Sequence, residues 1–423
     1  MEETKLGAWA TGFSLFKGFV GTGILYMPAN FITAGWGFST FTLILAAALT
    51  IIAAKLLIET REKLGGNLSY PDIGMKLYGT KGRVAVEVSI VGSQFTLVAA
   101  YIYFIAFTLQ SILFNAFAIT ISKWAFGALC FAIYTPLCLV RDMATLASTH
   151  LFGDIMIILT VLSIMTYAFL AMGEPDRKTA NEPFINTTLF PNAFGFSVFA
   201  YCGMGTVLPT YDMTADKKNY FKVLCYVCIT IMVIYIVFPL VCINAYGVYN
   251  GNKLSPVYNA FGVSTLITSS LTHGYLACLI QLMFILNLIF SYPLVINPAN
   301  LVIESYLFKK MPEGPKKKWS INFSRAVMVL GTILCALIIW ESLNMFLSVA
   351  GALACTPLCF ILPAVFHYKA CAETKNEKRF DMFLIIACTF IMVFCTIWGI
   401  GVWVMYEINL DNKWSDLIPH RQN

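Results

Sequence analysis

Two apolar segments of this chain are each interrupted by a Gly-x-Gly sequence that is followed within five residues by proline. The first interruption covers 21–28 (GTGILYMP), and the second covers 203–209 (GMGTVLP), about half the chain further on. Backbone that is not helical is tolerated at membrane depth only where it is buried in protein or lines a cavity. Breaks at corresponding places in the two halves of a membrane protein indicate the binding site of a secondary transporter. The pattern therefore predicts a carrier of a small solute.

Composition supports an integral membrane protein. Of the 423 residues, 59% are hydrophobic and only 12% are charged, whereas soluble domains carry roughly a quarter charged residues. A helix needs about 20 mostly apolar residues to span a bilayer. We therefore predict an all-α fold with eleven transmembrane helices in a single transporter domain over 1–423. The predicted spans are 7–31, 38–59, 84–114, 124–140, 145–172, 192–212, 221–247, 273–307, 323–341, 343–366 and 380–407.

The breaks fall in predicted spans one and six. Spans one to five (about 7–172) and six to ten (about 192–366) then form two units of five helices, and the odd number requires the second unit to be inverted. Span eleven (about 380–407) is an appendage. Between spans, 69–79 is short and amphipathic, which predicts an interfacial helix, and 248–270 is predicted to be a polar loop that contains a short helix.

Charge placement predicts the orientation. Most of the 28 Lys and Arg residues lie in loops on the side of the N-terminus, and basic loops stay in the cytoplasm. We therefore expect a cytoplasmic N-terminus and an outside or lumenal C-terminus. The sequon at Asn186 then lies on the outer side as a candidate glycosylation site. Either the plasma membrane or a lysosomal or vacuolar membrane fits this prediction.

Several segments resemble the amino acid/auxin permease family, especially its proton-coupled and vacuolar neutral amino acid branches. The first-helix signature of that family is similar to 15–28 (LFKGFVGTGILYMP), and the sixth-helix signature is similar to 199–209 (FAYCGMGTVLP). The eighth helix is similar to 291–294 (SYPL), and the ninth-to-tenth helix region is similar to Arg325 with 346–363. The resemblance implies an amino acid transporter. One position departs from it, because relatives in the proton-coupled branch often carry Glu where this chain has Cys202.

The chemistry of an amino acid suits broken helices. Backbone N–H groups at the start of a half-helix favour a carboxylate, and carbonyl groups at the end of one favour an ammonium group. Side chains beside the breaks and on spans three and eight are then expected to contact the substrate, in a mostly apolar pocket that fits neutral amino acids. The candidate substrate-binding residues are Gly21, Thr22, Gly23, Tyr26, Tyr101, Tyr201, Cys202, Gly203, Met204, Gly205 and Ser291, with Gln94 and Asn287 as further polar candidates.

Charged residues inside predicted spans are costly and usually functional. Lys17 precedes the first break, and Asp154 lies well inside span five. His150 and Asp154 are four residues apart and so share a helix face. We predict that these three residues act in gating or coupling, with Lys17 and Asp154 meeting across spans one and five.

The sequence leaves the coupling ion open between a co-transported proton, which we favour, and sodium. A non-transporting amino acid sensor on the same fold is a further alternative. We expect no enzyme activity, no metal site and no cofactor, because the four histidines are scattered and no nucleophile–base set converges. The expected partners are an amino acid substrate and the lipid bilayer, with no nucleic acid and no obligate protein partner.

Overall fold

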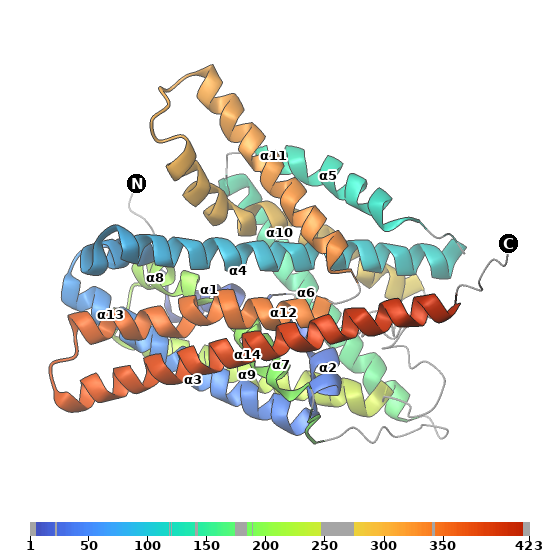
Figure 1. Cartoon of the computed structure of the whole chain (residues 1–423), viewed down its shortest axis with the longest axis horizontal. Helices are drawn as coiled ribbons and strands as arrows, with labels where there is room; N and C mark the ends of the chain where they lie inside the picture. Colours follow the sequence, from blue (N-terminus) through green and yellow to red (C-terminus); the bar gives the residue numbers. More distant parts are fainter. Residues whose placement is uncertain are drawn as a thin grey trace.

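The computed structural model describes residues 6–21, 23–117, 119, 121–139, 143–173, 184–187, 189–246, 275–340 and 343–417. Within them the fold is all-helical, as predicted, and contains no named strand. Figure 1 shows the helices as a bundle whose long members run roughly parallel to one axis, with α11 tilted across one side. The first half of the chain contains α1 (Ala8–Phe19), α2 (Gly23–Ala34), α3 (Trp36–Leu64), α4 (Tyr70–Phe117), α5 (Lys123–Leu139) and α6 (Met143–Met172).

The second half also begins with two short helices separated by a break, followed by long helices. It contains α7 (Phe190–Ala200), α8 (Met204–Met213), α9 (Lys217–Tyr246), α10 (Tyr275–Leu307), α11 (Pro315–Ile338), α12 (Leu343–Ala350), the π-helical turns η2 (Gly351–Cys355) and η3 (Pro357–Ile361), α13 (Leu362–Ala370) and α14 (Lys375–Leu417). Among the described residues, eight helices are long and apolar enough to cross a membrane, with further shorter apolar helices. The number of eleven spans stays a prediction. The predicted loop at 248–270 lies outside the described residues.

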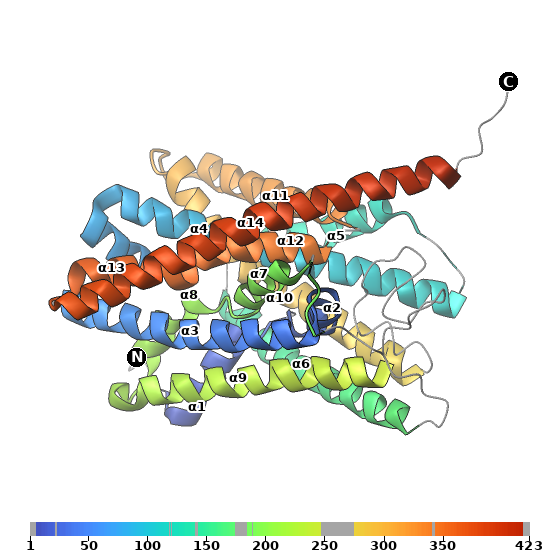
Figure 2. The same cartoon turned by 60° about the horizontal axis from the view of Figure 1, so that its bottom comes forward.

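Both predicted breaks are present. The first separates α1 from α2, and its backbone is extended at Val20 (φ −87°, ψ 111°). The second separates α7 from α8 at residues 201–203. α1 packs against α8 and α2 packs against α7, so the half-helices of the two repeats pair crosswise at the centre of the bundle. Figure 2 shows α2, α7 and α8 among the long helices, whereas α1 reaches the outside of the bundle beside α9.

The predicted interfacial helix forms the first part of α4. Gly79 has φ 64° and ψ −152°, which reverses the chain between this short helix and the long remainder of α4. The two arms cross closely, because a Cβ atom on Gly74 would lie 2.6 Å from the carbonyl oxygen of Gly82. Only glycine permits both the positive φ and the close crossing.

The first half-helix of span six lies against span ten with backbone touching backbone. A Cβ atom on Gly195 of α7 would lie 1.9 Å from the carbonyl oxygen of Ser348, and one on Gly351 would lie 2.0 Å from that of Gly195. Span ten is wound more widely here, since η2 and η3 are π-helical. Wide turns of this kind are rare in proteins, and those that occur are often found at functional sites.

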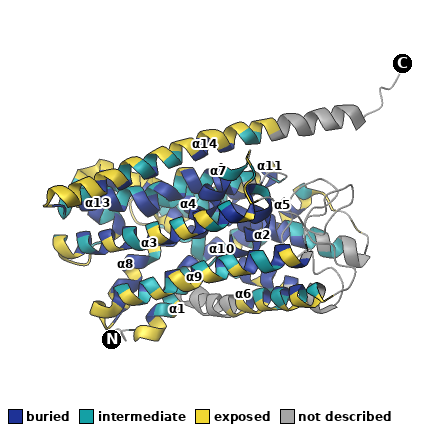
Figure 3. Ribbon diagram, turned by 90° about the horizontal axis from the view of Figure 1, so that it is seen from below, coloured by how far each residue is buried: buried dark blue, intermediate teal, exposed yellow. Residues whose placement is uncertain are grey.

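Burial follows the expected pattern of a membrane protein. Figure 3 shows buried residues on α2, α4 and α7 in the interior, and a stripe of exposed residues along the outer face of α14. The exposed residues on α14 include Phe383, Phe390 and Ile397. Apolar side chains on the outside are favourable where lipid surrounds the protein, so the burial pattern agrees with a bilayer around this bundle.

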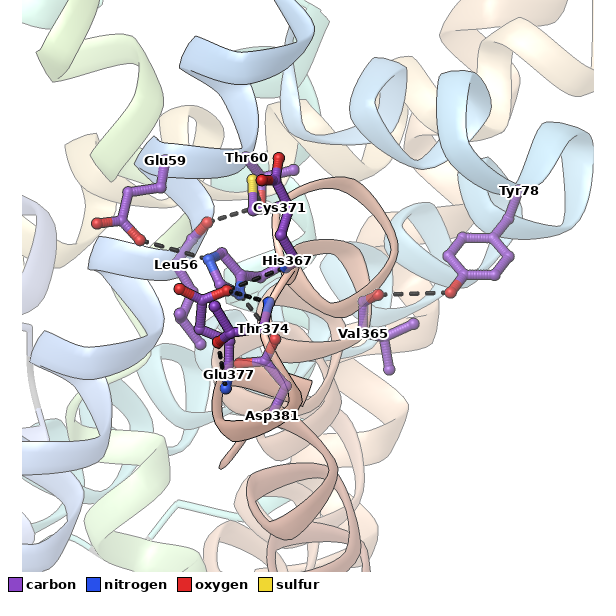
Figure 4. A network of polar contacts seen from close by, with 11 residues as sticks. Leu56, Glu59, Thr60, Tyr78, Val365, His367, Cys371, Thr374, Glu377 and Asp381 are labelled. Atoms are coloured by element: carbon purple, nitrogen blue, oxygen red, sulfur yellow. Dashed lines mark hydrogen bonds and ion pairs between the residues drawn. The ribbon is translucent and has the colours of Figure 1, made fainter. Parts of the chain in front are cut away.

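A polar network ties span ten to α3 and α14 (Figure 4). Nδ1 of His367 lies 2.7 Å from Oδ2 of Asp381, and Nε2 lies 3.4 Å from Oε2 of Glu59. Asp381 is almost fully buried, whereas the Glu59 side chain is 43% exposed. This network joins the second, tenth and last spans at one end of the bundle.

Candidate functional site

A cavity of about 480 Å³ lies where the two broken helices meet. Both breaks, α4, α6, α10 and span ten contribute to its wall. The ends of α1 and α7 and the starts of α2 and α8 all lie at the breaks. The site therefore offers helix C-termini and helix N-termini together, which is the arrangement that an amino acid's two charged groups require.

The glycines of the breaks have two different roles. A Cβ atom on Gly203 would lie 2.5 Å from the Phe19 ring and 2.8 Å from the carbonyl oxygen of Gly18, so Gly203 allows the two breaks to touch. Gly21 and Gly205 line the cavity, and a Cβ atom on either would meet nothing within 4 Å. Gly203 therefore serves packing, whereas Gly21 and Gly205 leave backbone open to the cavity.

Most of the predicted binding residues line the cavity. Beside the glycines just described, the lining includes Gly23, Tyr101, Cys202 and Ser291 from the predicted set, together with Gln94 and Asn287. On α10 the Ser291 hydroxyl donates a hydrogen bond to Oδ1 of Asn287 at 2.9 Å. Residues from four separate spans thus come together around one space.

Three predicted residues lie beside the cavity and not on its wall. Tyr26 is buried and its hydroxyl donates to the carbonyl oxygen of Ala100 at 3.2 Å. Tyr201 is buried with its ring centroid 5.7 Å from that of Tyr235, and Met204 is also in the core. Thr22 lies outside the described residues.

The predicted charged residues are only partly described. Lys17 lines the cavity and has an interaction partner. It is the one charged side chain among the described lining residues. His150 and Asp154 belong to α6, but their side chains are outside the described part of the chain. The proposed contact of Lys17 with Asp154 stays a prediction.

Several lining residues were not predicted. They are Ser14, Phe19, Ile90, Ser93, Leu97, Thr206, Thr210 and Leu358, among others. Ser93 adjoins the predicted Gln94, and Thr206 is in the first turn of α8, directly after the second break. Ser93 and Thr206 could have been predicted, because each is a polar residue within an apolar run of the sequence. Leu358 is on η3, and its place on the cavity wall depends on how span ten packs, which the sequence does not reveal.

The cavity extends toward one end of the bundle. Ser14, Met213 and Pro298 line it. Ser14 precedes the first break, Met213 is at the end of α8 beyond the second break, and Pro298 is in the last third of α10. On the other side of the breaks, a cluster of packed aromatic rings fills the interior. The ring of Phe104 lies 6.4 Å from that of Tyr26 and 4.6 Å from that of Phe284, and all three are buried. The site is thus closed on the α2 side.

A buried arginine holds the far end of α8. Arg61 of α3 is 3% exposed, pairs with Asp212 and donates to the carbonyl oxygen of Leu208 at 3.2 Å. The Tyr211 hydroxyl donates to Glu62. α1 is joined to the same place, since Leu6 N–H donates to the Met213 carbonyl oxygen at 2.8 Å and the hydroxyls of Thr11 and Thr214 lie 3.1 Å apart.

Asn186 occupies the connection before α7. Its N–H group donates to the Ala34 carbonyl oxygen at 3.0 Å, and its Oδ1 accepts from the Leu189 N–H group at 3.3 Å. The side chain is half-buried. Its glycosylation stays a prediction.

Comparison with known proteins identifies the family. The family described as "Transmembrane amino acid transporter protein" matches residues 4–406. The chain is 32% identical over 389 residues to vacuolar amino acid transporter 3 of Schizosaccharomyces pombe, covering 90% of this chain and 56% of that protein. It is 28% identical over 418 residues to amino acid transporter AVT3A of Arabidopsis thaliana, covering 95% of this chain and 89% of that protein. The chain thus spans about half the length of the fungal relative.

Two solved structures show a similar fold. MhsT in complex with L-phenylalanine has a TM-score of 0.58 at 13% identity, and the match covers 92% of this chain and 98% of MhsT. A Na⁺-coupled sialic acid symporter in a substrate-bound outward-open state has a TM-score of 0.55 at 13% identity, with 94% and 90% covered. At this identity the likeness concerns the fold alone, and it supports the predicted five-plus-five inverted repeat.

Proposed function

This chain belongs to the transmembrane amino acid transporter family, and from that premise we propose that it moves neutral amino acids across a membrane by alternating access, coupled to protons. The observation that carries the proposal is the cavity at the meeting point of the two broken helices. The family consists of transporters, which also agrees with the expectation that the chain is not an enzyme.

The geometry supports an amino acid as substrate. The starts of α2 and α8 carry backbone N–H groups without helical partners, which stabilise a carboxylate. The ends of α1 and α7 carry carbonyl groups, which stabilise an ammonium group. In this proposal Gly21, Gly23 and Gly205 allow the substrate to approach the backbone closely.

The rest of the wall favours an uncharged side chain. Tyr101, Leu97 and Leu288 present aromatic and aliphatic surface to the cavity. Burying a charged substrate side chain against such surface is costly without a partner of opposite charge. Neutral amino acids avoid this cost, and a volume of about 480 Å³ accommodates aliphatic and aromatic members of that class.

Sodium coupling is the second candidate. The Asn287 and Ser291 oxygens face the cavity from α10 beside the first break, and oxygen ligands of this kind suit a hard cation. One neighbour in fold is named as Na⁺-coupled. We favour protons because a sodium cage needs several more oxygen ligands than these two side chains supply.

The names of the relatives support a proposal for the membrane in which this chain lies. The fungal relatives are named vacuolar, so we propose a vacuolar or lysosome-like membrane for this chain, with the N-terminus in the cytoplasm. With that orientation, the end of the bundle toward which the cavity extends is the cytoplasmic end. The structure then represents an inward-facing state. A sensor that does not transport is the remaining alternative.

Uptake into proteoliposomes tests the proposal. The purified chain is reconstituted, and a panel of labelled amino acids is offered under an imposed pH gradient or an imposed sodium gradient. We expect uptake of neutral amino acids that responds to the pH gradient. Uptake driven by sodium alone would replace the proton proposal, and binding without uptake would favour the sensor.

A pair of glycine variants links uptake to the site. A Cβ atom on Gly23 would be in ordinary van der Waals contact with Ala200, 3.7 Å from its Cα. Gly23→Val adds two further methyl groups at the cavity wall, and it should abolish uptake while the protein still reaches the membrane. Gly7→Val is the matched control, because a Cβ atom there meets nothing within 4 Å and Gly7 is outside the cavity lining. Normal uptake by Gly23→Val would contradict the proposed site.

A further inference from the structure

The wall of the cavity contains a pair of thiols from two different spans. Cys202 lies in the non-helical connection between α7 and α8 and lines the cavity. Cys359 lies on η3 and is 1% exposed. Their sulfur atoms are 3.9 Å apart, although 157 residues separate them in the chain. Cys355 of η2 adjoins the Cys202 thiol as well.

The fold holds this pair together. Gly195 and Gly351 allow α7 and span ten to touch through their backbones, one turn or two before the break. Cys355 and Cys359 are four residues apart, so their side chains share one face of span ten, and both thiols interact with the Cys202 thiol. The Thr356 hydroxyl donates to the Gly351 carbonyl oxygen at 3.3 Å, which supports the wide turn.

The two thiols differ in access. Cys202 is partly exposed to the cavity, so a small polar oxidant that enters the cavity reaches it. Cys359 is covered, with 1% of its surface exposed, and is not part of the cavity wall. One accessible thiol beside a covered one is the arrangement in which the first is oxidised and the second resolves it.

We propose that Cys202 and Cys359 form an oxidisable pair that closes to a disulfide. A hydroperoxide transfers one oxygen atom to the Cys202 thiol, which gives a sulfenic acid and, from hydrogen peroxide, one water. The Cys359 sulfur then attacks the sulfenic sulfur, the S–O bond breaks, and a second water leaves as the S–S bond forms. Two thiols are oxidised and one peroxide is reduced, so no further reactant is needed.

The required movement is small. A disulfide has a sulfur–sulfur bond of about 2.05 Å, so the two atoms at 3.9 Å must approach by about 2 Å. Cys202 lies in the connection between α7 and α8, where its N–H group donates to the Phe199 carbonyl oxygen at 3.1 Å, and outside a continuous helix it can adjust more readily than a residue inside one.

The expected consequence is an arrest of transport, and this step rests on the function proposed above. Alternating access requires one bundle of helices to rock or gate against the other around the site. A covalent bond from the break of span six to span ten fixes these two elements to each other. Reduction of the disulfide restores their freedom, so the arrest is reversible.

The test uses the full chain in proteoliposomes treated with graded hydrogen peroxide. Remaining thiols are blocked with a maleimide, and digested protein is analysed by mass spectrometry. We expect a peptide pair joined through Cys202 and Cys359, and a loss of uptake in proportion to the joined fraction, recovered by dithiothreitol. Neither Cys202→Ser nor Cys359→Ser should give the joined pair, and Cys359→Ser should accumulate a sulfenic acid on Cys202 that dimedone labels.

Cys228→Ser on α9 is the matched control, because it also removes a buried thiol but should leave the joined pair intact. Absence of the Cys202–Cys359 pair, or a pair of Cys202 with Cys355 in its place, would overturn the assignment. Full uptake by protein in which every chain has the Cys202–Cys359 disulfide would show that the disulfide does not arrest transport. Joined peptides in a protein that transports nothing even when reduced would leave the thiol pair standing and reject the proposed function.

Discussion

His367 and Asp381 form a buried hydrogen bond, with Nδ1 and Oδ2 2.7 Å apart, that connects the end of α13 to the start of α14. The same imidazole also lies 3.4 Å from the half-exposed carboxylate of Glu59. One histidine thus has two acidic neighbours that differ in burial. A buried charged or polar pair loses much more when one partner is removed than an exposed pair does.

This difference predicts the effect of removing each acid. Asp381→Ala should destabilise the folded protein by about 3 kcal/mol, because it leaves Nδ1 of the buried imidazole without its hydrogen-bond partner. Glu59→Ala should cost under about 1 kcal/mol, since water replaces the exposed carboxylate. Thermal unfolding in detergent, followed by the reactivity of the buried thiols, measures both. Equal shifts of the two midpoints would show that Asp381 does not hold α14.

The second prediction separates the two roles of the break glycines. Gly203→Ala should lower both thermal stability and uptake, because the new methyl group would meet the Phe19 ring and the Gly18 carbonyl oxygen. Gly21→Ala should leave the unfolding midpoint nearly unchanged, because the space around it is open, and should weaken substrate affinity by filling the cavity. Measured midpoints and uptake at several substrate concentrations test this. A reversed order of the two midpoints would contradict the assigned roles.

The third prediction concerns the acid that this chain lacks. Cys202→Ser should retain the response of uptake to a pH gradient, because a thiol is a much weaker acid than a carboxyl group and is not expected to carry the coupled proton. Cys202→Glu should move the pH optimum. Uptake measured across external pH values provides the comparison. If Cys202→Ser lost the pH response while retaining exchange of substrate, the thiol would be part of the coupling.

The fourth prediction compares two cations on α3. Arg61 is buried and bonded to Leu208 and Asp212 at the end of α8, whereas Lys63 pairs with Glu373 at the surface. Arg61→Gln should lower stability by about 2 kcal/mol, because a buried carbonyl oxygen loses its charged donor. Lys63→Gln should produce no measurable shift. The midpoints of thermal unfolding of the two variants provide the test. Indistinguishable midpoints would mean that Arg61 does not hold α8.

The fifth prediction concerns Lys17 and Asp154. If they pair, each neutral replacement should impair folding or transport, because it leaves a charge unpaired inside the protein. The double variant Lys17→Met with Asp154→Asn should then be less harmful than the two single effects combined. Expression level and uptake are measured for all three variants. Strictly additive defects would show that Lys17 and Asp154 do not pair. Asp154 would then be a candidate proton-binding site independent of Lys17.

The sequence predicted the parts of the fold that local chemistry determines. Glycine and proline within apolar runs located both breaks, and the amphipathic segment before Gly79 located the short helix of α4. The direction of side chains next to a break was harder to predict. Tyr26 and Tyr201 point into the core, because the helical phase restarts after each break by an angle that no residue pattern specifies.

Contacts between distant segments were not predictable. The sulfur atoms of Cys359 and Cys202 lie 3.9 Å apart although 157 residues separate them, and a single sequence gives no signal for how span ten packs against the second break. The pairing of Arg61 with Asp212 depends likewise on how α3 crosses α8. Sequence thus supplied the candidates, and packing determined which of them meet.

The backbone contact between Gly195 and Gly351 has a mechanical consequence. It pins α7 to span ten before the break, while beyond the break α8 is bonded to α1 through Thr214 and Thr11. Residues 201–203 then work as a joint between an anchored arm, α7, and a second arm, α8, which can move together with α1 once its bonds to Arg61 of α3 are released. We expect the motion that opens and closes this protein to be a rotation about that joint.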